Sequence, residues 1–138
     1  MSKVAVIYWS GTGNTETMAG AVADGAKEKG AEVSLLTCAE VTSVADFDAV
    51  ALGCPAMGAE ELEDSEFVPM LESIEPALSG KKVGLFGSYG WGDGEWMRSW
   101  EARCAEKGIA LAAESVLANE APDDDAIAAC KALGGALA

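Results

Sequence analysis

The chain has 138 residues, a net formal charge of −14 and a hydrophobic content of 50%. This length suits one domain with its own core, and the charge argues against nucleic acid and anionic membranes as partners, because both require a basic surface. The sequence contains no histidine, which excludes the usual general base, the usual metal ligand and any Ser–His or Cys–His nucleophile pair.

The first predicted elements are a strand, a polar loop and a helix. The apolar run 3–9 is typical of a buried strand, and helical spacing begins at about Thr15 and continues to Lys29, with Gly30 as the stop signal. The loop between them precedes a helix N-terminus, where free backbone N–H groups and the helix dipole favour an anion. Its residues are Ser10, Gly11, Thr12, Gly13, Asn14 and Thr15.

This loop predicts a phosphate site that is held by hydrogen bonds rather than by ion pairs. Its hydroxyls and its amide are neutral donors, and it has no Lys or Arg. The nucleoside-triphosphate loop requires a Lys after the glycines, which is absent here. The dinucleotide-binding loop requires a third glycine, but that position is Glu16. The plain alternative is a turn followed by a helix cap, without any ligand.

The rest of the chain alternates strand-like and helix-like segments. Strands are predicted over 31–37, at an edge of the sheet, and over 48–54, 81–88 and 109–117. Helices are predicted over 67–78, where Pro69 and Pro76 leave the ends open, around 96–108 and after 122. This alternation predicts an α/β fold: a doubly wound five-stranded parallel sheet of order 2-1-3-4-5 with helices on both faces, in a single domain over residues 1–138.

In such a sheet a ligand binds where the first and third strands diverge, at their carboxyl ends. Loops 10–15 and 55–66 follow those two strands, and loops 88–94 and 118–122 are predicted beside them. Trp91 has a glycine on each side, so its indole suits a flat aromatic ligand; the alternative is an indole folded onto the protein surface. Met57 either contacts the same ligand through its polarizable sulfur or fills a gap.

Acidic residues gather around the four loops. The windows 8–16, 54–66, 87–95 and 117–125 contain no Lys or Arg and twelve of the 23 acidic residues. Several of these acids begin predicted helices, where they complement the dipole, but the dipoles do not explain why bases are absent around a phosphate site. An acidic rim of this kind would steer basic protein partners.

The cysteines indicate ordinary reduced thiols. The four of them are scattered and form no C-x-x-C spacing, which disfavours zinc and a redox disulfide. No stretch reads as a signal peptide, and no apolar run approaches membrane-spanning length. These features lead us to expect a cytoplasmic protein with no metal and no membrane contact.

Four stretches carry a family resemblance: YWSGTGNTE over 8–16, GCPAMG over 53–58, EELE over 60–63 and GKKVGLFGSYGWG over 80–92. The chain resembles the short-chain flavodoxins, in particular the clostridial type, over essentially its whole length. The first stretch is shared widely among proteins that bind flavin mononucleotide (FMN), and the last is far more specific.

The resemblance implies FMN bound without a covalent bond. By this analogy loop 10–15 binds the phosphate, Pro55 and Ser88 lie near the ribityl chain, and Met57 and Trp91 flank the two faces of the ring. Glu60 would accept a hydrogen bond from flavin N3. The predicted cofactor-binding set is completed by Gly11, Ala56, Gly58, Ala59, Tyr89, Gly90 and, at the pyrimidine end, Asn119.

The resemblance also implies that a peptide flip brings the Gly58 carbonyl to N5–H of the semiquinone. Two residues depart from the family pattern. Pro55 stands where some relatives have a hydroxyl, and Ala59 stands where the clostridial pattern often has Asp or Ser. If the flip makes a type II turn, Ala59 needs a positive φ at a cost of roughly 1–2 kcal/mol, which would weaken the semiquinone.

The leading function is therefore a low-potential, one-electron carrier that shuttles electrons between redox proteins through the semiquinone and hydroquinone of FMN. It is expected to be a monomer and not an enzyme, with basic redox proteins docking on the acidic rim. The alternative is an FMN-dependent NAD(P)H:quinone-type reductase, which shares the fold. A signalling receiver domain would need aspartates after the first strand and a Lys after the fifth, and the sequence has neither.

Overall fold

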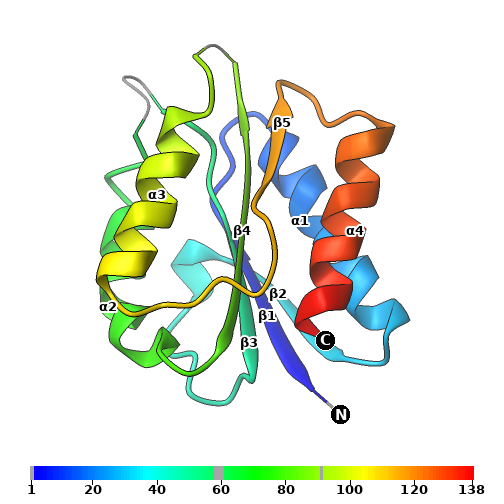
Figure 1. Cartoon of the computed structure of the whole chain (residues 1–138), viewed down its shortest axis with the longest axis vertical. Helices are drawn as coiled ribbons and strands as arrows, with labels where there is room; N and C mark the ends of the chain where they lie inside the picture. Colours follow the sequence, from blue (N-terminus) through cyan, green and yellow to red (C-terminus); the bar gives the residue numbers. More distant parts are fainter. Residues whose placement is uncertain (1, 58–60, 91) are drawn as a thin grey trace.

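A computed structural model describes residues 2–57, 61–90 and 92–138. Its five strands form one parallel sheet in the order β2-β1-β3-β4-β5, which confirms the predicted topology (Figure 1). The strands are β1 Lys3–Tyr8, β2 Glu32–Thr37, β3 Ala49–Gly53, β4 Lys82–Tyr89 and β5 Val116–Asn119. The helices are α1 Asn14–Glu28, α2 Phe67–Leu78, α3 Glu95–Glu106 and α4 Asp124–Leu137, and a short 3-10 helix, η1, spans Cys38–Glu40.

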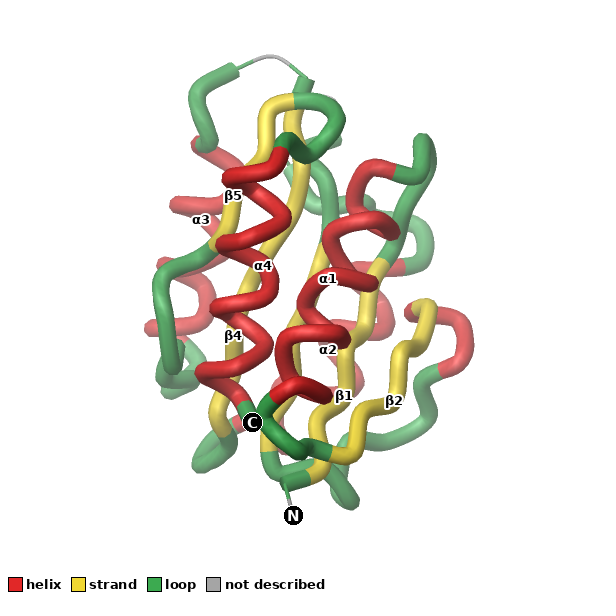
Figure 2. Tube along the Cα trace, turned by 90° about the vertical axis from the view of Figure 1, so that its right-hand side faces the viewer, coloured by secondary structure: helices red, strands yellow, loops and turns green. Residues whose placement is uncertain are grey.

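Both faces of the sheet are covered. Helices α2 and α3 lie on one face and α1 and α4 on the other, with β2 and β5 at the two edges (Figures 1 and 2). The protein has one hydrophobic core on each face of the sheet, and successive side chains of β1 point to alternate faces. Ile7 packs on the α2/α3 face, whereas Val4 and Val6 pack on the α1/α4 face. Because all three side chains are fully buried, β1 reads as a continuous apolar run.

The fifth strand differs most from its prediction. Of the predicted span 109–117, only Val116 and Leu117 belong to β5, although Leu111 makes one isolated bridge to Val83. Strand β4 advances three residues from Val83 to Phe86, while the neighbouring chain advances five, from Leu111 to Val116. The two chains therefore fall out of register between these pairings, and residues 112–115 are irregular rather than strand.

Two further local features were not predicted. Both prolines of α2 lie within it: Pro69 is in the first turn, where an N–H has no intrahelical partner, and Pro76 is in the interior. The helix η1 begins with a capping box, in which Thr37 N–H donates to Glu40 Oε1 at 2.8 Å. The spacing of Thr37 and Glu40 is the sequence signal for that box. None of the helices in the described ranges is long and apolar enough to cross a membrane.

Candidate functional site

The loops that follow β1, β3, β4 and β5 meet at the carboxyl ends of the strands and enclose a groove of about 430 Å³, which we call the strand-end groove. This volume falls within the range of roughly 300–1,000 Å³ that small-molecule sites occupy. The groove is lined by Trp9, Gly11, Thr12, Asn14, Thr15, Pro55, Ala56, Met57, Ser88, Tyr89, Gly90 and Glu120. The structure thus brings together residues from all four loops that the sequence singled out.

Backbone hydrogen bonds fix each loop to the neighbouring strand end. They run from Trp9 N to Gly53 O (3.0 Å), from Ala56 N to Ser88 O (3.0 Å) and from Glu120 N to Tyr89 O (2.6 Å). Trp9 and Glu120 each lie one residue beyond their strand, and Ala56 lies three residues beyond β3, so the ladder pattern continues into the loops. The walls of the groove are therefore continuous with the rigid sheet.

Loop 10–15 is organised by Ser10 and Gly13. Gly13 has φ 96° at the N-cap of α1, a conformation that costs a glycine little. The Ser10 hydroxyl oxygen accepts from Gly13 N at 3.1 Å and from Glu16 N at 3.3 Å. Since α-helix geometry leaves the first N–H groups without intrahelical partners, those of Asn14 and Thr15 remain as donors for an anion at the helix start.

Thr15 and Ser88 join α1 to β4 beneath the groove. Their hydroxyl oxygens lie 3.3 Å apart, and the two residues are 1% and 5% exposed. Each hydroxyl is therefore already partnered, and a ligand would meet this pair as a polar floor. The other predicted phosphate residues in the groove, Thr12 and Asn14, are more exposed.

Sequence reasoning left Trp9 and Glu120 out of the site, although both line the groove. Trp9 was assigned to the first strand, but β1 ends at Tyr8 and the indole extends over the loop, where a Cβ on Gly11 would lie 3.1 Å from its ring. Its Nε1 donates to Glu66 Oε1 at 3.2 Å. A bulky amphipathic side chain directly before the polar loop was the available signal. The sequence placed Glu120 in loop 118–122 and among the acidic residues of the rim, but not among the cofactor contacts.

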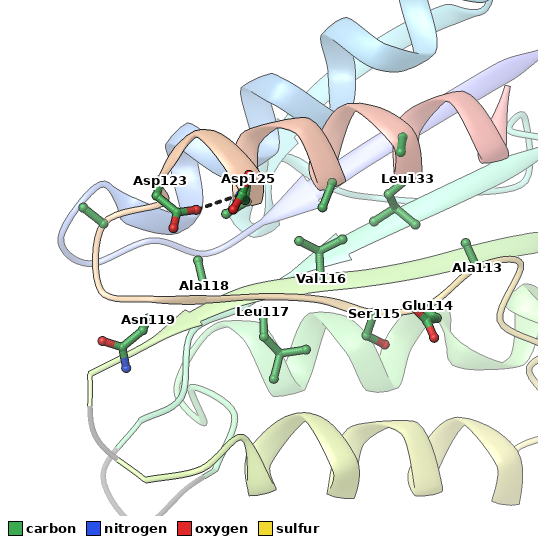
Figure 3. Close-up of a pocket in the computed structure, with 14 residues that line it drawn as sticks. Ala113, Glu114, Ser115, Val116, Leu117, Ala118, Asn119, Asp123, Asp125 and Leu133 are labelled. Atoms are coloured by element: carbon green, nitrogen blue, oxygen red, sulfur yellow. Dashed lines mark hydrogen bonds between the residues drawn. The ribbon is translucent and has the colours of Figure 1, made fainter.

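Several predicted residues are not among those that line the groove. Ser10 faces a smaller neighbouring pocket, and Asn119 lines a different groove, of about 660 Å³, between β5 and α4 (Figure 3). Figure 3 also shows Asp123, whose carboxylate caps α4 by accepting from Ala126 N at 2.8 Å. Four predicted residues lie outside the described residues: Gly58, Ala59, Glu60 and Trp91.

The electrostatic setting is acidic, with one exception. Glu120 is the charged residue among those that line the strand-end groove. The rim was expected to lack bases, but Arg98 reaches back from α3 to Asp93, with Nη2 at 3.0 Å from Oδ1. This pair is exposed, so it neutralises one rim charge without adding much stability.

Burial is the main influence on the cysteine thiols. All four cysteines are buried and free. Burial raises the pKa of Cys54, which lies directly beside the groove wall, to about 12. Its thiol therefore stays protonated at neutral pH. Across the described ranges, no cluster of side chains is suited to hold a metal ion.

Comparison with known proteins places this groove in a family. The family model described as Flavodoxin matches residues 6–134. The chain belongs to the flavodoxin family. It is 48% identical over 137 residues to the flavodoxin of Megasphaera elsdenii, covering 98% of each chain. It is 46% identical over 121 residues to the flavodoxin of Clostridium beijerinckii, covering 86% of this chain and 88% of that one.

The fold agrees with this assignment. The solution structure of two-electron reduced Megasphaera elsdenii flavodoxin matches with a TM-score of 0.88 and 47% identity over 97% of each chain. The oxidised flavodoxin 1 of Bacillus cereus matches with a TM-score of 0.84 at 25% identity, covering 99% of this chain and 97% of that one. Flavodoxins are FMN proteins of electron transport, so the cofactor is FMN and the chain is an electron carrier rather than an enzyme.

The residues of the groove fit FMN. At one end, loop 10–15 offers hydroxyls, an amide and helix-terminal N–H groups, which suit a phosphate without any basic side chain. At the other end, Met57 and Tyr89 provide polarizable and aromatic surface. A Cβ added at Gly90 would meet no atom within 4 Å, so this stretch of the wall is open.

Proposed function

We propose that the chain, as a single FMN-binding domain over residues 1–138, shuttles electrons at low potential between redox proteins, one at a time, through the neutral semiquinone and the hydroquinone of FMN. The observation that carries the proposal is the strand-end groove, with a phosphate-type loop at one end and apolar walls at the other. Bound FMN supplies the electron-accepting ring. The residues of the chain bind, orient and partly cover it.

The roles of individual residues follow from where they lie or, outside the described residues, from the sequence. Thr12, Asn14 and Thr15 hold the phosphate together with the helix-terminal N–H groups, while Ser10 and Gly13 shape the loop. Pro55 and Ser88 line the groove, and we assign them to the ribityl chain. Met57 covers one face of the ring. The sequence assigns the remaining contacts to Gly58, Ala59, Glu60, Trp91 and Asn119.

Charge supports the low potential and the choice of partner. Twelve acidic residues fall in the loop windows around the site, and Glu120 lines the groove itself. A negative surround opposes the negative charge that full reduction places on the flavin, and so lowers the potential of that step. The same charge steers basic redox proteins to the groove. We place the chain in the cytoplasm as a monomer.

A turnover assay distinguishes the electron carrier from the alternative function, an NAD(P)H:quinone-type reductase. We expect anaerobic holoprotein to be reduced by NAD(P)H only when a separate reductase is added, because the strand-end groove would be filled by FMN and an acidic surround disfavours a second anionic nucleotide beside it. Absorbance of NAD(P)H, followed with and without a quinone acceptor, gives the rate. Multiple turnovers without an added reductase would establish the alternative.

A further inference from the structure

Glu63 lies in the segment that connects β3 to α2, and the residue is 6% exposed. It accepts hydrogen bonds from the backbone N–H groups of Ser65 at 3.0 Å, Glu66 at 2.8 Å and Phe67 at 2.8 Å. The Ser65 hydroxyl donates to it as well. One buried carboxylate therefore satisfies the donors at the start of α2, where the helix itself provides no partners.

The backbone of the same residue is attached to the end of β3. Glu63 N–H donates to Cys54 Sγ at 3.4 Å. Cys54 is itself fixed, because its N–H donates to Phe86 O at 3.2 Å and its carbonyl accepts from Trp96 Nε1 at 3.1 Å. Glu63 thus makes two attachments. Its backbone N–H is bonded to the residue that follows β3, and its side chain is bonded to the start of α2.

That intervening chain carries Met57, which lines the strand-end groove. Met57 and Glu61 exchange two backbone hydrogen bonds, with Met57 N to Glu61 O at 2.7 Å and Glu61 N to Met57 O at 3.0 Å. Met57 is therefore paired with a residue only two positions before Glu63. The groove wall is held on one side by Cys54 and on the other by Glu61, and Glu63 is adjacent to both attachments.

We infer that Glu63 is a positioning residue for FMN: by attaching the chain beside Glu61 to Cys54 and to α2, it sets the place of Met57, the backbone partner of Glu61, in the groove wall, and so the affinity and the potentials of the flavin. This inference rests on the proposed function. Glu63 itself does not line the groove. Its effect on the cofactor passes through the hydrogen bonds at Cys54 and at the Met57–Glu61 pair.

The carboxylate is suited to this role because it stays charged. Burial opposes ionisation, but the hydrogen bonds from Ser65, Phe67 and Glu66 outweigh burial and hold the pKa of Glu63 below its ordinary value. At neutral pH all of its acceptor capacity is therefore available. An amide in the same place accepts through one oxygen only, and its NH₂ group faces donors.

The test compares Glu63→Gln with Glu40→Gln in FMN-loaded protein. Glu40 is a matched control, because its carboxylate also caps backbone, accepting from Thr37 N at 2.8 Å, and its loss changes the net charge equally. It caps η1 and is not among the residues that line the groove. We expect Glu63→Gln to raise the FMN dissociation constant about tenfold, or about 1.4 kcal/mol, the cost of losing a helix cap.

We further expect at least one flavin potential to shift in Glu63→Gln by about 30 mV, a threefold change in relative affinity at about 59 mV per tenfold. Glu40→Gln should leave both measurements close to the wild type. Glu63→Asp, which keeps the charge but shortens the reach, should show a smaller effect of the same kind, and it serves as the reporter if Glu63→Gln does not fold.

Two results would overturn the inference. One is a fall in thermal stability of Glu63→Gln with unchanged FMN affinity and potentials, which would mean that Glu63 only caps α2. The other is an FMN affinity and flavin potentials that are unchanged in Glu63→Asp but altered in Glu63→Gln. That pattern would mean that the negative charge, and not the hydrogen bonds of Glu63, affects the flavin. Failure of the proposed function looks different, because the wild type itself would then turn over NAD(P)H without an added reductase or show no one-electron steps, whatever the behaviour of the Glu63 variants.

Discussion

Replacement of Gly134 by alanine is expected to destabilise the chain by about 3 kcal/mol, at the upper end of what overpacking usually costs. Helices α1 and α4 approach through glycines. A Cβ on Gly134 would lie 2.0 Å from Val22 O and 2.8 Å from Ala26 N, both in the backbone of α1. The same holds in reverse for Gly25, whose Cβ would meet Lys131 O at 2.0 Å. Because the obstructing atoms are backbone, no side-chain rotation relieves the contact.

The neighbouring glycine is the matched control. A Cβ on Gly135 would meet Lys29 side-chain carbons at 3.5 Å, an ordinary contact with a flexible chain. Gly135→Ala should therefore stabilise the protein by about 0.5–1 kcal/mol, since alanine favours the helix over glycine. Urea unfolding of both apoproteins, followed by circular dichroism, gives the two free energies. Equal changes in the two variants would mean that α1 and α4 are not in close backbone contact.

Arg103→Leu is expected to destabilise the chain by about 3 kcal/mol, because it leaves a buried carboxylate unpaired. The Glu75 side chain, on α2, is 5% exposed and accepts two hydrogen bonds from Arg103 on α3, from Nε at 2.7 Å and from Nη2 at 2.9 Å. This bidentate pair connects the two helices that cover one face of the sheet. The Arg103 side chain is 28% exposed, which places the expected cost at the lower end of the range for buried pairs.

The double variant distinguishes a lost pair from lost packing. Removing both charges in Glu75→Leu/Arg103→Leu should recover most of the stability, because no buried charge then remains unpaired. Denaturant unfolding of the wild type, both single variants and the double variant completes the cycle. Additive losses would show that the two side chains contribute independently, and that the pair does not couple α2 to α3.

The central strands β1, β3 and β4 could be predicted because they are buried on both faces and therefore appear as apolar runs. The fifth strand could not be placed in the same way. Residues 109–117 have the apolar content of a strand, but pairing depends on register with β4, and the irregular residues 112–115 change that register without a sequence signal. The sequence also leaves the ends of α2 open, because proline disfavours a helix interior. The helix nevertheless includes both prolines, since its packing on the core outweighs the free-energy cost of proline.

The sequence predicted which loops form the site, but it could not predict which side chains point into the groove. Topology brings the ends of parallel strands to one edge, so the four loops converge as expected. Which way a side chain points depends on local hydrogen bonds, and Ser10 shows this by satisfying its own loop. Individual side-chain contacts are similarly hidden from the sequence: Arg98 folds back onto Asp93, and Trp9 donates a hydrogen bond to the distant Glu66.

The central claim is a low-potential, one-electron carrier with FMN, and a potentiometric titration of the purified holoprotein followed by visible absorbance tests it most directly. We predict oxidised flavin bands at one FMN per chain and two separated one-electron steps. A long-wavelength band should rise in the first step and disappear in the second, which should lie at low potential because of the acidic surround. A protein without flavin bands, or a single two-electron step without the long-wavelength band, would contradict the account.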